Sequence, residues 1–117
     1  MKINLKELKE ICETPGAPGF EDPIRKKIID NIQSSVDDYY TDNMGNLITI
    51  KRSSKNPGNK KLMFAAHMDE IGFIVTHITK DGFLKFHTLG GFDPKTLTAQ
   101  RVMVHGKKSL IGVMGTK

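Results

Sequence analysis

The run KLMFAA, residues 61–66, constrains the fold of this chain more than any other segment. It is short and continuously apolar, which is the pattern expected of a β-strand that is buried on both faces of a sheet. Two helices are predicted upstream of it, so the combination indicates the α/β class.

The first 35 residues have helical periodicity. Asn4 can cap a first helix, and Glu7 stands at the capping-box position three residues later. The segment TPGAPGF, residues 14–20, ends that helix because its prolines and glycines cannot continue it. A second helix is expected to follow, with Asp22 as its cap and Pro23 at its first helical position.

From residue 36 onward the pattern changes to that of β-strands and turns. We expect strands over 36–41, 46–51, 61–66, 71–79, 83–88, 101–106 and 109–115, separated by turns at DNMGN, KNPGNK, KDG and KK and by a longer loop at 89–100. Helices and strands are mixed before about residue 70, and strands alone follow. We therefore predict a boundary between residues 1–70 and residues 71–117.

The composition is that of a soluble globular domain, with 38% hydrophobic and 26% charged residues in a chain of 117. No run approaches the roughly 18 apolar residues of a membrane helix. The N-terminal MKINLKELKE lacks the apolar region of a signal peptide. Cys12 is the single cysteine, so the chain cannot form an internal disulfide. These features favour a cytoplasmic protein without a membrane partner.

The net charge of +5 is concentrated in KRSSKNPGNKK, residues 51–61. A nucleic-acid-binding patch is one interpretation of such a segment. No aromatic residues are interleaved with these lysines, and no nucleic-acid-binding motif accompanies them. We expect a solvated loop and no nucleic-acid partner.

His67 and Asp69 follow the predicted buried strand directly, in the stretch MFAAHMDEIGF. If the strand continues through them, both side chains point to the same side. Imidazole is a good ligand for zinc or cobalt, and a nearby carboxylate can orient the ring. The alternative is a local hydrogen bond at the end of a core strand, since zinc takes about four ligands. The spacing alone leaves both interpretations open.

The remaining polar candidates have simpler interpretations. Structural or exposed roles are expected for His77, His87 and His105, turn formation for Asp42 and Asp93, and a place in the core for Cys12.

Several segments together resemble one family. They are TPGAPGFED, DNMGNLI, KLMFAAHMDEIGFIV, DGFLKFHTLGGFD and GVMGTK, in that order along the chain. The chain is similar over essentially its whole length to the glutamyl and deblocking aminopeptidases with two metal ions, which assemble as tetrahedral dodecamers. Some of these carry the name cellulase or endoglucanase. The segment AAHMDEIGF is the most specific of the five.

The resemblance implies the zinc-exopeptidase fold, a mixed sheet with helices on both faces. Residues 1–70 would be the N-terminal part of the catalytic domain, and residues 71–117 the beginning of an inserted β-rich, PDZ-like assembly domain. His67 matches the first metal ligand, and Asp69 matches the catalytic carboxylate that tunes this histidine. Two divalent metal ions, zinc or cobalt, would polarise the scissile carbonyl and activate water, and a glutamate would act as general base.

The resemblance covers only part of such an enzyme. The other metal ligands and the general base have no counterpart in this sequence, and Glu70 belongs to the first motif. We therefore expect an N-terminal fragment of a metalloaminopeptidase that acts on peptides and forms a homo-oligomer, with the fragment alone inactive. The chain ends at LIGVMGTK, directly after an apolar strand, which supports this expectation. The alternatives are a non-enzymatic β-rich module for binding or assembly and a basic binding domain.

Overall fold

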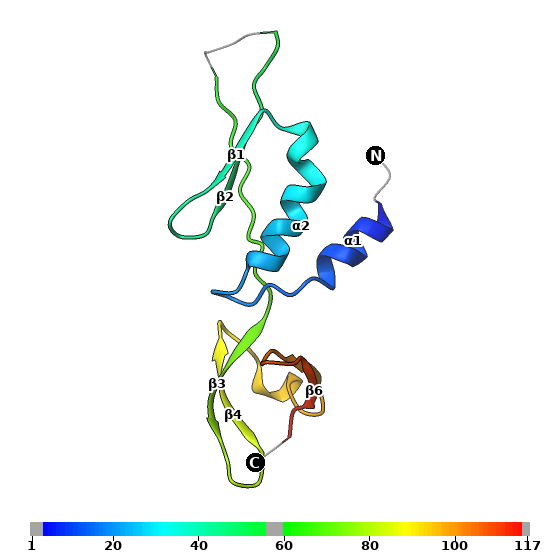
Figure 1. The fold of residues 1–117 in the computed structure, drawn as a ribbon, viewed down its shortest axis with the longest axis vertical. Helices are drawn as coiled ribbons and strands as arrows, with labels where there is room; N and C mark the ends of the chain where they lie inside the picture. The colour runs from blue at the N-terminus through cyan, green and yellow to red at the C-terminus, as the bar shows by residue number, and fades with distance from the viewer. Residues whose placement is uncertain (1–3, 56–59, 116–117) are drawn as a thin grey trace. The chain divides into compact units, whose positions relative to one another are not determined.

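The computed structural model describes residues 4–55 and 60–115, and Figure 1 shows their helices and strands. The elements are α1 (Leu5–Cys12), α2 (Asp22–Ile32), β1 (Asp38–Thr41), β2 (Leu47–Ile50), β3 (Gly72–Ile78), β4 (Leu84–Leu89), β5 (Arg101–Val104) and β6 (Leu110–Val113), with short 3-10 helices at Gln33–Ser35 and Pro94–Thr96. The chain divides into two compact units, Met1–Phe73 and Ile74–Lys117.

The strands form three two-stranded sheets, β1–β2, β3–β4 and β5–β6. The first and third are antiparallel, with Tyr39 opposite Thr49 and Met103 opposite Ile111. These pairings confirm the predicted hairpins, and the two helices confirm the mixed α/β class. The predicted turn at residues 55–60 falls largely on residues 56–59, which lie outside the described part of the chain.

The two helix starts differ in how they are capped. At α1 the Asn4 side chain accepts a hydrogen bond from the Glu7 backbone N–H at 3.3 Å, as predicted. At α2 the cap residue is Glu21, and no side chain caps the helix. The prediction that Asp22 caps α2 is therefore wrong. Asp22 already lies within the helix, and its carboxylate pairs instead with Arg25, one turn further along.

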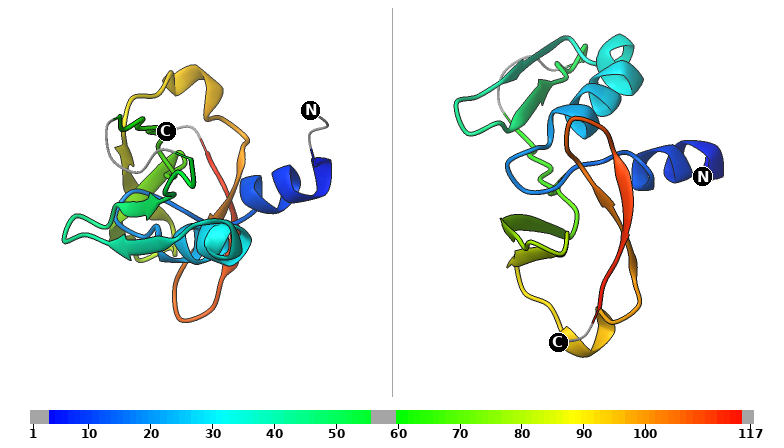
Figure 2. Two further views of the ribbon diagram at one scale, coloured as in Figure 1. Left: turned by 90° about the horizontal axis from the view of Figure 1, so that it is seen from above. Right: turned by 60° about the horizontal axis from the view of Figure 1, so that its bottom comes forward.

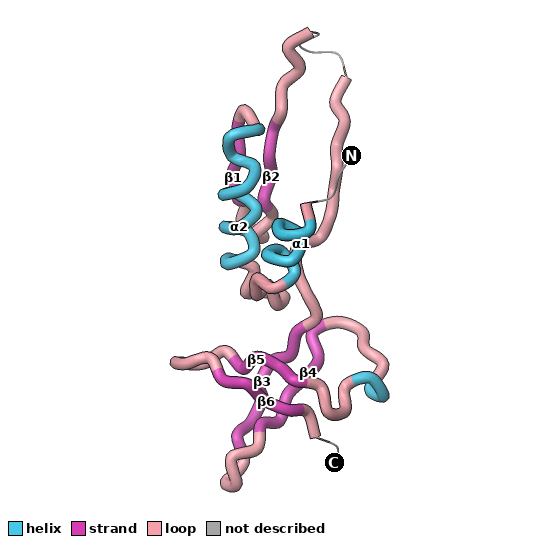
Figure 3. Tube along the Cα trace, turned by 90° about the vertical axis from the view of Figure 1, so that its right-hand side faces the viewer, coloured by secondary structure: helices cyan, strands magenta, loops and turns pink. Residues whose placement is uncertain are grey.

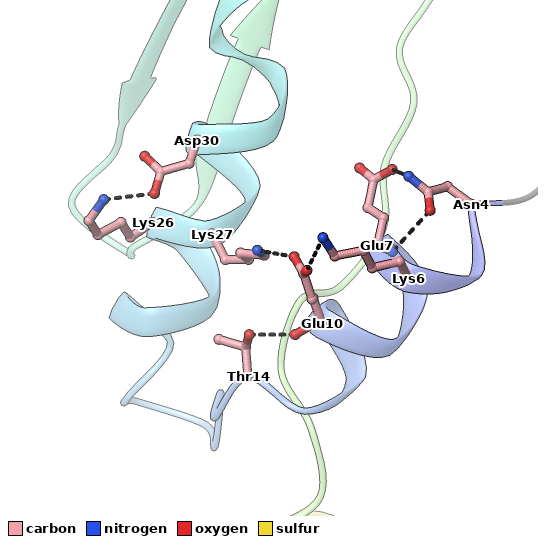
Figure 4. Close-up of polar contacts among 8 residues, drawn as sticks. All are labelled: Asn4, Lys6, Glu7, Glu10, Thr14, Lys26, Lys27 and Asp30. Carbon is pink, nitrogen blue, oxygen red and sulfur yellow. Dashed lines mark hydrogen bonds and ion pairs between the residues drawn. The ribbon is translucent and has the colours of Figure 1, made fainter.

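The helices of the first unit are joined by an ion pair, and α2 contributes a buried apolar residue. Glu10 on α1 pairs with Lys27 on α2 (Figure 4). The hydrogen bond and charge of Lys27 lower the pKa of Glu10. Exposed ion pairs of this kind contribute little to stability. The main apolar anchor is Ile24, which is only 3% exposed.

Helix α2 lies alongside the β1–β2 hairpin, as Figures 1 and 2 show. The contact is polar, because Arg25 Nε donates to the Gly45 carbonyl oxygen at 2.9 Å. Gly45 lies in the hairpin turn and has a φ of +85°, a conformation that favours glycine. The turn is thus fixed from outside by a helix side chain.

Asp42 organises the same turn from within. Its Oδ1 accepts hydrogen bonds from the backbone N–H groups of Met44 and Asn46, each at 2.9 Å, and its Oδ2 accepts one from the Asn46 side chain, also at 2.9 Å. These bonds, chiefly that of the Asn46 side chain, lower the pKa of Asp42 from its ordinary 3.8. The predicted turn-forming role is confirmed.

A pH dependence follows from this turn. A carboxylate whose pKa is lowered by folding stabilises the fold above the unfolded pKa of 3.8, and this contribution is lost as the pH falls through the folded pKa. Asp42→Ala is therefore expected to increase opening of the β1–β2 hairpin at about pH 6 and to do so much less at about pH 3. Amide hydrogen-exchange protection of the hairpin would measure both. An Asp42→Ala effect that is the same at the two pH values would contradict this account.

The prediction of a buried strand at residues 61–66 is wrong. Residues 60–71 have no regular secondary structure and run as a loop between β2 and β3 (Figure 3). The side chains of this run are open to solvent, and Phe64 is 88% exposed. A strand exists only where a neighbouring strand supplies hydrogen bonds, and this segment belongs to none of the three described sheets.

The prediction that Cys12 lies in the core is also wrong. Cys12 is a free, exposed thiol at the end of α1. None of the residues of α1 is buried, because the apolar face of this helix is not covered by the described parts of the chain. Helical periodicity identified the face correctly but not what covers it.

The second unit holds β3 from Ile74 onward together with β4, β5 and β6. Asp93 caps the short helix Pro94–Thr96 by accepting from the Lys95 N–H at 3.0 Å, which confirms its turn role. The backbone N–H of Ala99 donates to Met114 O at 2.9 Å, next to the hairpin's open end. Met114 is 7% exposed and, with Ile24, is one of two buried hydrophobic residues in the described ranges.

Candidate metal centre

His67 and Asp69 are in direct contact, as their spacing suggested. The Nδ1 atom of His67 lies 3.0 Å from Asp69 Oδ1 and 3.0 Å from the backbone carbonyl oxygen of Asp69. A carbonyl oxygen can only accept a hydrogen bond, so Nδ1 must carry the proton that both oxygens share. The structure therefore fixes the tautomer of a neutral His67.

This tautomer leaves the lone pair on Nε2. The His67 side chain is 84% exposed and that of Asp69 is 44% exposed, so Nε2 is accessible from solvent. A ligating histidine commonly donates its other ring N–H to a carboxylate or a backbone carbonyl, which orients the ring and raises its basicity. His67 has both kinds of acceptor, so its donor chemistry fits a divalent metal ion.

The pair does not make a complete metal site. Among residues 4–55 and 60–115, no group of three or more His, Cys, Asp or Glu side chains is arranged to hold a metal ion. The described chain therefore offers one imidazole ligand with its orienting carboxylate. Zinc requires about four ligands, so any further ligands must come from elsewhere.

The other three histidines belong to the second unit. His77 lies on β3, His87 on β4, and His105 follows β5. All three are exposed, in keeping with the simple roles expected of them.

No described helix is long and apolar enough to span a membrane.

The sequence analysis did not predict the contact between Gly16 and Glu70, which supports the segment that contains His67 and Asp69. The Glu70 side chain accepts a hydrogen bond from the Gly16 backbone N–H at 2.9 Å. The two residues are 54 positions apart, and no local pattern in the sequence signals their pairing. The glycine–proline segment 14–20 was expected only to end the first helix.

Comparison with known proteins gives a consistent result. Residues 45–117, which include His67 and Asp69, match the family model described as M42 glutamyl aminopeptidase. The lysyl aminopeptidase of Pyrococcus furiosus is 39% identical over 115 residues, which cover 97% of this chain and 32% of that protein. The chain therefore spans about a third of the length of this curated relative.

Solved structures also match this chain over about a third of their own length. The Pyrococcus horikoshii TET1 peptidase, which can assemble into a tetrahedron or a large octahedral shell, superposes with a TM-score of 0.82 at 38% identity. The match covers 97% of this chain and 33% of that one. A Thermotoga maritima protein named endoglucanase has a TM-score of 0.82 at 42% identity, with 94% of this chain and 34% of that one covered.

Proposed function

Because this chain belongs to the M42 glutamyl aminopeptidase family, we propose that it works as part of a metal-dependent aminopeptidase that hydrolyses N-terminal residues from peptides. The observation that carries the proposal is the contact between His67 Nδ1 and Asp69, which leaves Nε2 available for a metal ion. Relatives that match nearly the whole chain and carry aminopeptidase names support it.

In this proposal His67 Nε2 would hold one of two divalent ions, zinc or cobalt. Such ions would supply Lewis-acid polarisation of the scissile carbonyl and would lower the pKa of a bound water. Asp69 keeps the Nδ1 proton in place and stabilises the partial positive charge that ligation places on the ring. In this proposal the further ligands and the general base would come from residues outside this chain, since the described residues bring no group of three or more His, Cys, Asp or Glu side chains together.

Residues 71–117 are proposed to begin a β-rich, PDZ-like assembly domain. Six residues on β3 and β6 support this idea, because they expose large apolar side chains: Ile74, Val75, Ile78, Leu110, Ile111 and Val113. Exposed large apolar side chains on strands are candidates for burial against further protein surface. A homo-oligomer would cover them, by analogy with a similar solved structure that is a dodecamer. A cytoplasmic location completes the proposal.

The whole protein, meaning the polypeptide that contains this chain, provides the test. It is expected to release aniline from an aminoacyl-anilide when loaded with zinc or cobalt and to lose this activity with a chelator. The 117-residue chain alone is expected to be inactive, since it offers one ligand where a catalytic site needs about three. A whole protein without peptidase activity under any of these metals would contradict the proposal and favour a non-enzymatic assembly module.

A further inference from the structure

Two reciprocal hydrogen bonds join the α1–α2 loop to the residue that follows Asp69. The backbone N–H of Gly16 donates to Glu70 Oε1 at 2.9 Å. The backbone N–H of Glu70 donates to the Gly16 carbonyl oxygen at 2.8 Å. Both residues lie in the first unit, so these bonds fix the segment after His67 to a loop of the same compact body.

Close packing supports the same contact. Gly16 is buried, and a Cβ atom added there would lie 2.7 Å from Ile24 Cγ2 and 3.3 Å from the Met68 carbonyl oxygen. A Cβ atom added at Gly72 would lie 2.8 Å from Ala17 Cβ. The loop thus touches the segment at positions 68, 70 and 72. Positions 67, 69 and 71, which alternate with these contacts along the extended chain, are exposed, whereas Met68 is half-buried and Gly72 is buried.

The peptide plane between Asp69 and Glu70 connects this contact to the candidate ligand. Its carbonyl oxygen, on Asp69, accepts the Nδ1 proton of His67. Its N–H, on Glu70, donates to the Gly16 carbonyl oxygen. A peptide unit is planar, so fixing the direction of the N–H also fixes the direction of the C=O. The orientation of the His67 ring therefore depends on the contact between Gly16 and Glu70.

We propose that Glu70 is a positioning residue for the divalent-cation site: its carboxylate holds the Gly16 loop in place, and that loop orients the acceptor of His67. This inference rests on the proposed role of His67 as a metal ligand. Glu70 touches neither the metal nor the substrate in this scheme. Its effect is to hold the Nε2 atom of His67 in one orientation before a metal ion binds.

The test measures zinc affinity of the whole protein by competition with a chromophoric chelator, together with hydrogen exchange at the Gly16 amide. Glu70→Ala removes the acceptor and is expected to weaken zinc binding by about tenfold, the lower end of what such supporting residues contribute. It should also accelerate Gly16 exchange. Glu70→Gln keeps an oxygen that can accept the same bond, so it should retain both the affinity and the protection.

Two further variants separate the possible outcomes. Glu13→Ala removes an exposed carboxylate that pairs with Lys9, and it should change neither measurement. His67→Ala reports on the ligand itself. If His67→Ala leaves zinc affinity unchanged, the proposed metal site fails. If His67→Ala weakens binding but Glu70→Ala does not, the positioning role alone is overturned. A loss in Glu70→Gln equal to that in Glu70→Ala would also overturn it, since the charge and not the hydrogen bond would then matter.

Discussion

His67→Ala in the whole protein is expected to abolish occupancy of one metal position and to lower kcat/KM for peptide hydrolysis by about 10³-fold. The magnitude follows from the several kcal/mol of transition-state stabilisation that a Lewis-acidic ion supplies, since about 4 kcal/mol corresponds to three powers of ten. The structural reason is that the contacts of His67 Nδ1 with Asp69 orient the ring. They leave Nε2 as the atom that would bind the metal ion. Metal content by elemental analysis and steady-state kinetics would measure the two effects.

A matched control is available on the same chain. His105 is exposed, follows β5 and has no part in the proposed site. His105→Ala should therefore retain the metal content and leave kcat/KM within about twofold, since surface substitutions away from special features have small effects. A His67→Ala protein that keeps both metal ions and full activity would show that His67 is not a ligand.

Gly16→Ala is expected to destabilise the first unit by about 2 kcal/mol. The added Cβ would lie 2.7 Å from the Cγ2 atom of Ile24 and 3.3 Å from the Met68 carbonyl oxygen. Ile24 is only 3% exposed and therefore has little room to move. Overpacking of this kind outweighs the smaller entropic gain of replacing glycine. The free energy of local opening of α2, obtained from native-state hydrogen exchange, would report the change.

Gly91→Ala is the control for this substitution. No heavy atom lies within 4 Å of a Cβ built at Gly91, so the new methyl group meets open space. Its expected effect is within about 0.5 kcal/mol of zero. Equal stability of the Gly16→Ala and wild-type proteins would mean that the contact of the loop with Ile24 and residues 68–72 is looser than the structure shows.

Local features of the fold were predictable because their causes are local. Asp42 forms its turn through hydrogen bonds to residues within four positions, and Asn4 caps α1 through a residue three positions away. Hairpins such as β5–β6 are likewise built from neighbouring strands. The prediction that Asp22 caps α2 was wrong for a reason that is also local. The Asp22 carboxylate pairs with Arg25, three positions further along the chain.

The segment 61–66 failed for a different reason. Its apolar run was interpreted as a buried strand, but a strand requires a neighbouring strand, and the described residues do not pair with it. We propose that residues outside this chain supply those strands in the whole protein. Cys12 and the exposed face of α1 illustrate the same dependence.

The candidate site was half predictable. The spacing of His67 and Asp69 was enough to suggest their contact, because two residues with one between them lie within reach of each other. The support from Gly16 and Glu70 was not predictable, since it joins residues 54 positions apart through a hydrogen bond from the Gly16 backbone N–H to the Glu70 carboxylate. Such a contact depends on tertiary packing and leaves no periodic trace in the sequence.

In the proposed function, His67 is one ligand of a two-metal peptidase site that residues outside this chain complete. Native mass spectrometry of the protein purified from its source tests it most directly, because one spectrum reports both the polypeptide mass and the bound metal ions. We predict a subunit roughly three times the 13.1 kDa of this chain, in line with its 32% share of the lysyl aminopeptidase, carrying two divalent ions. A subunit of 13.1 kDa without metal would contradict the claim.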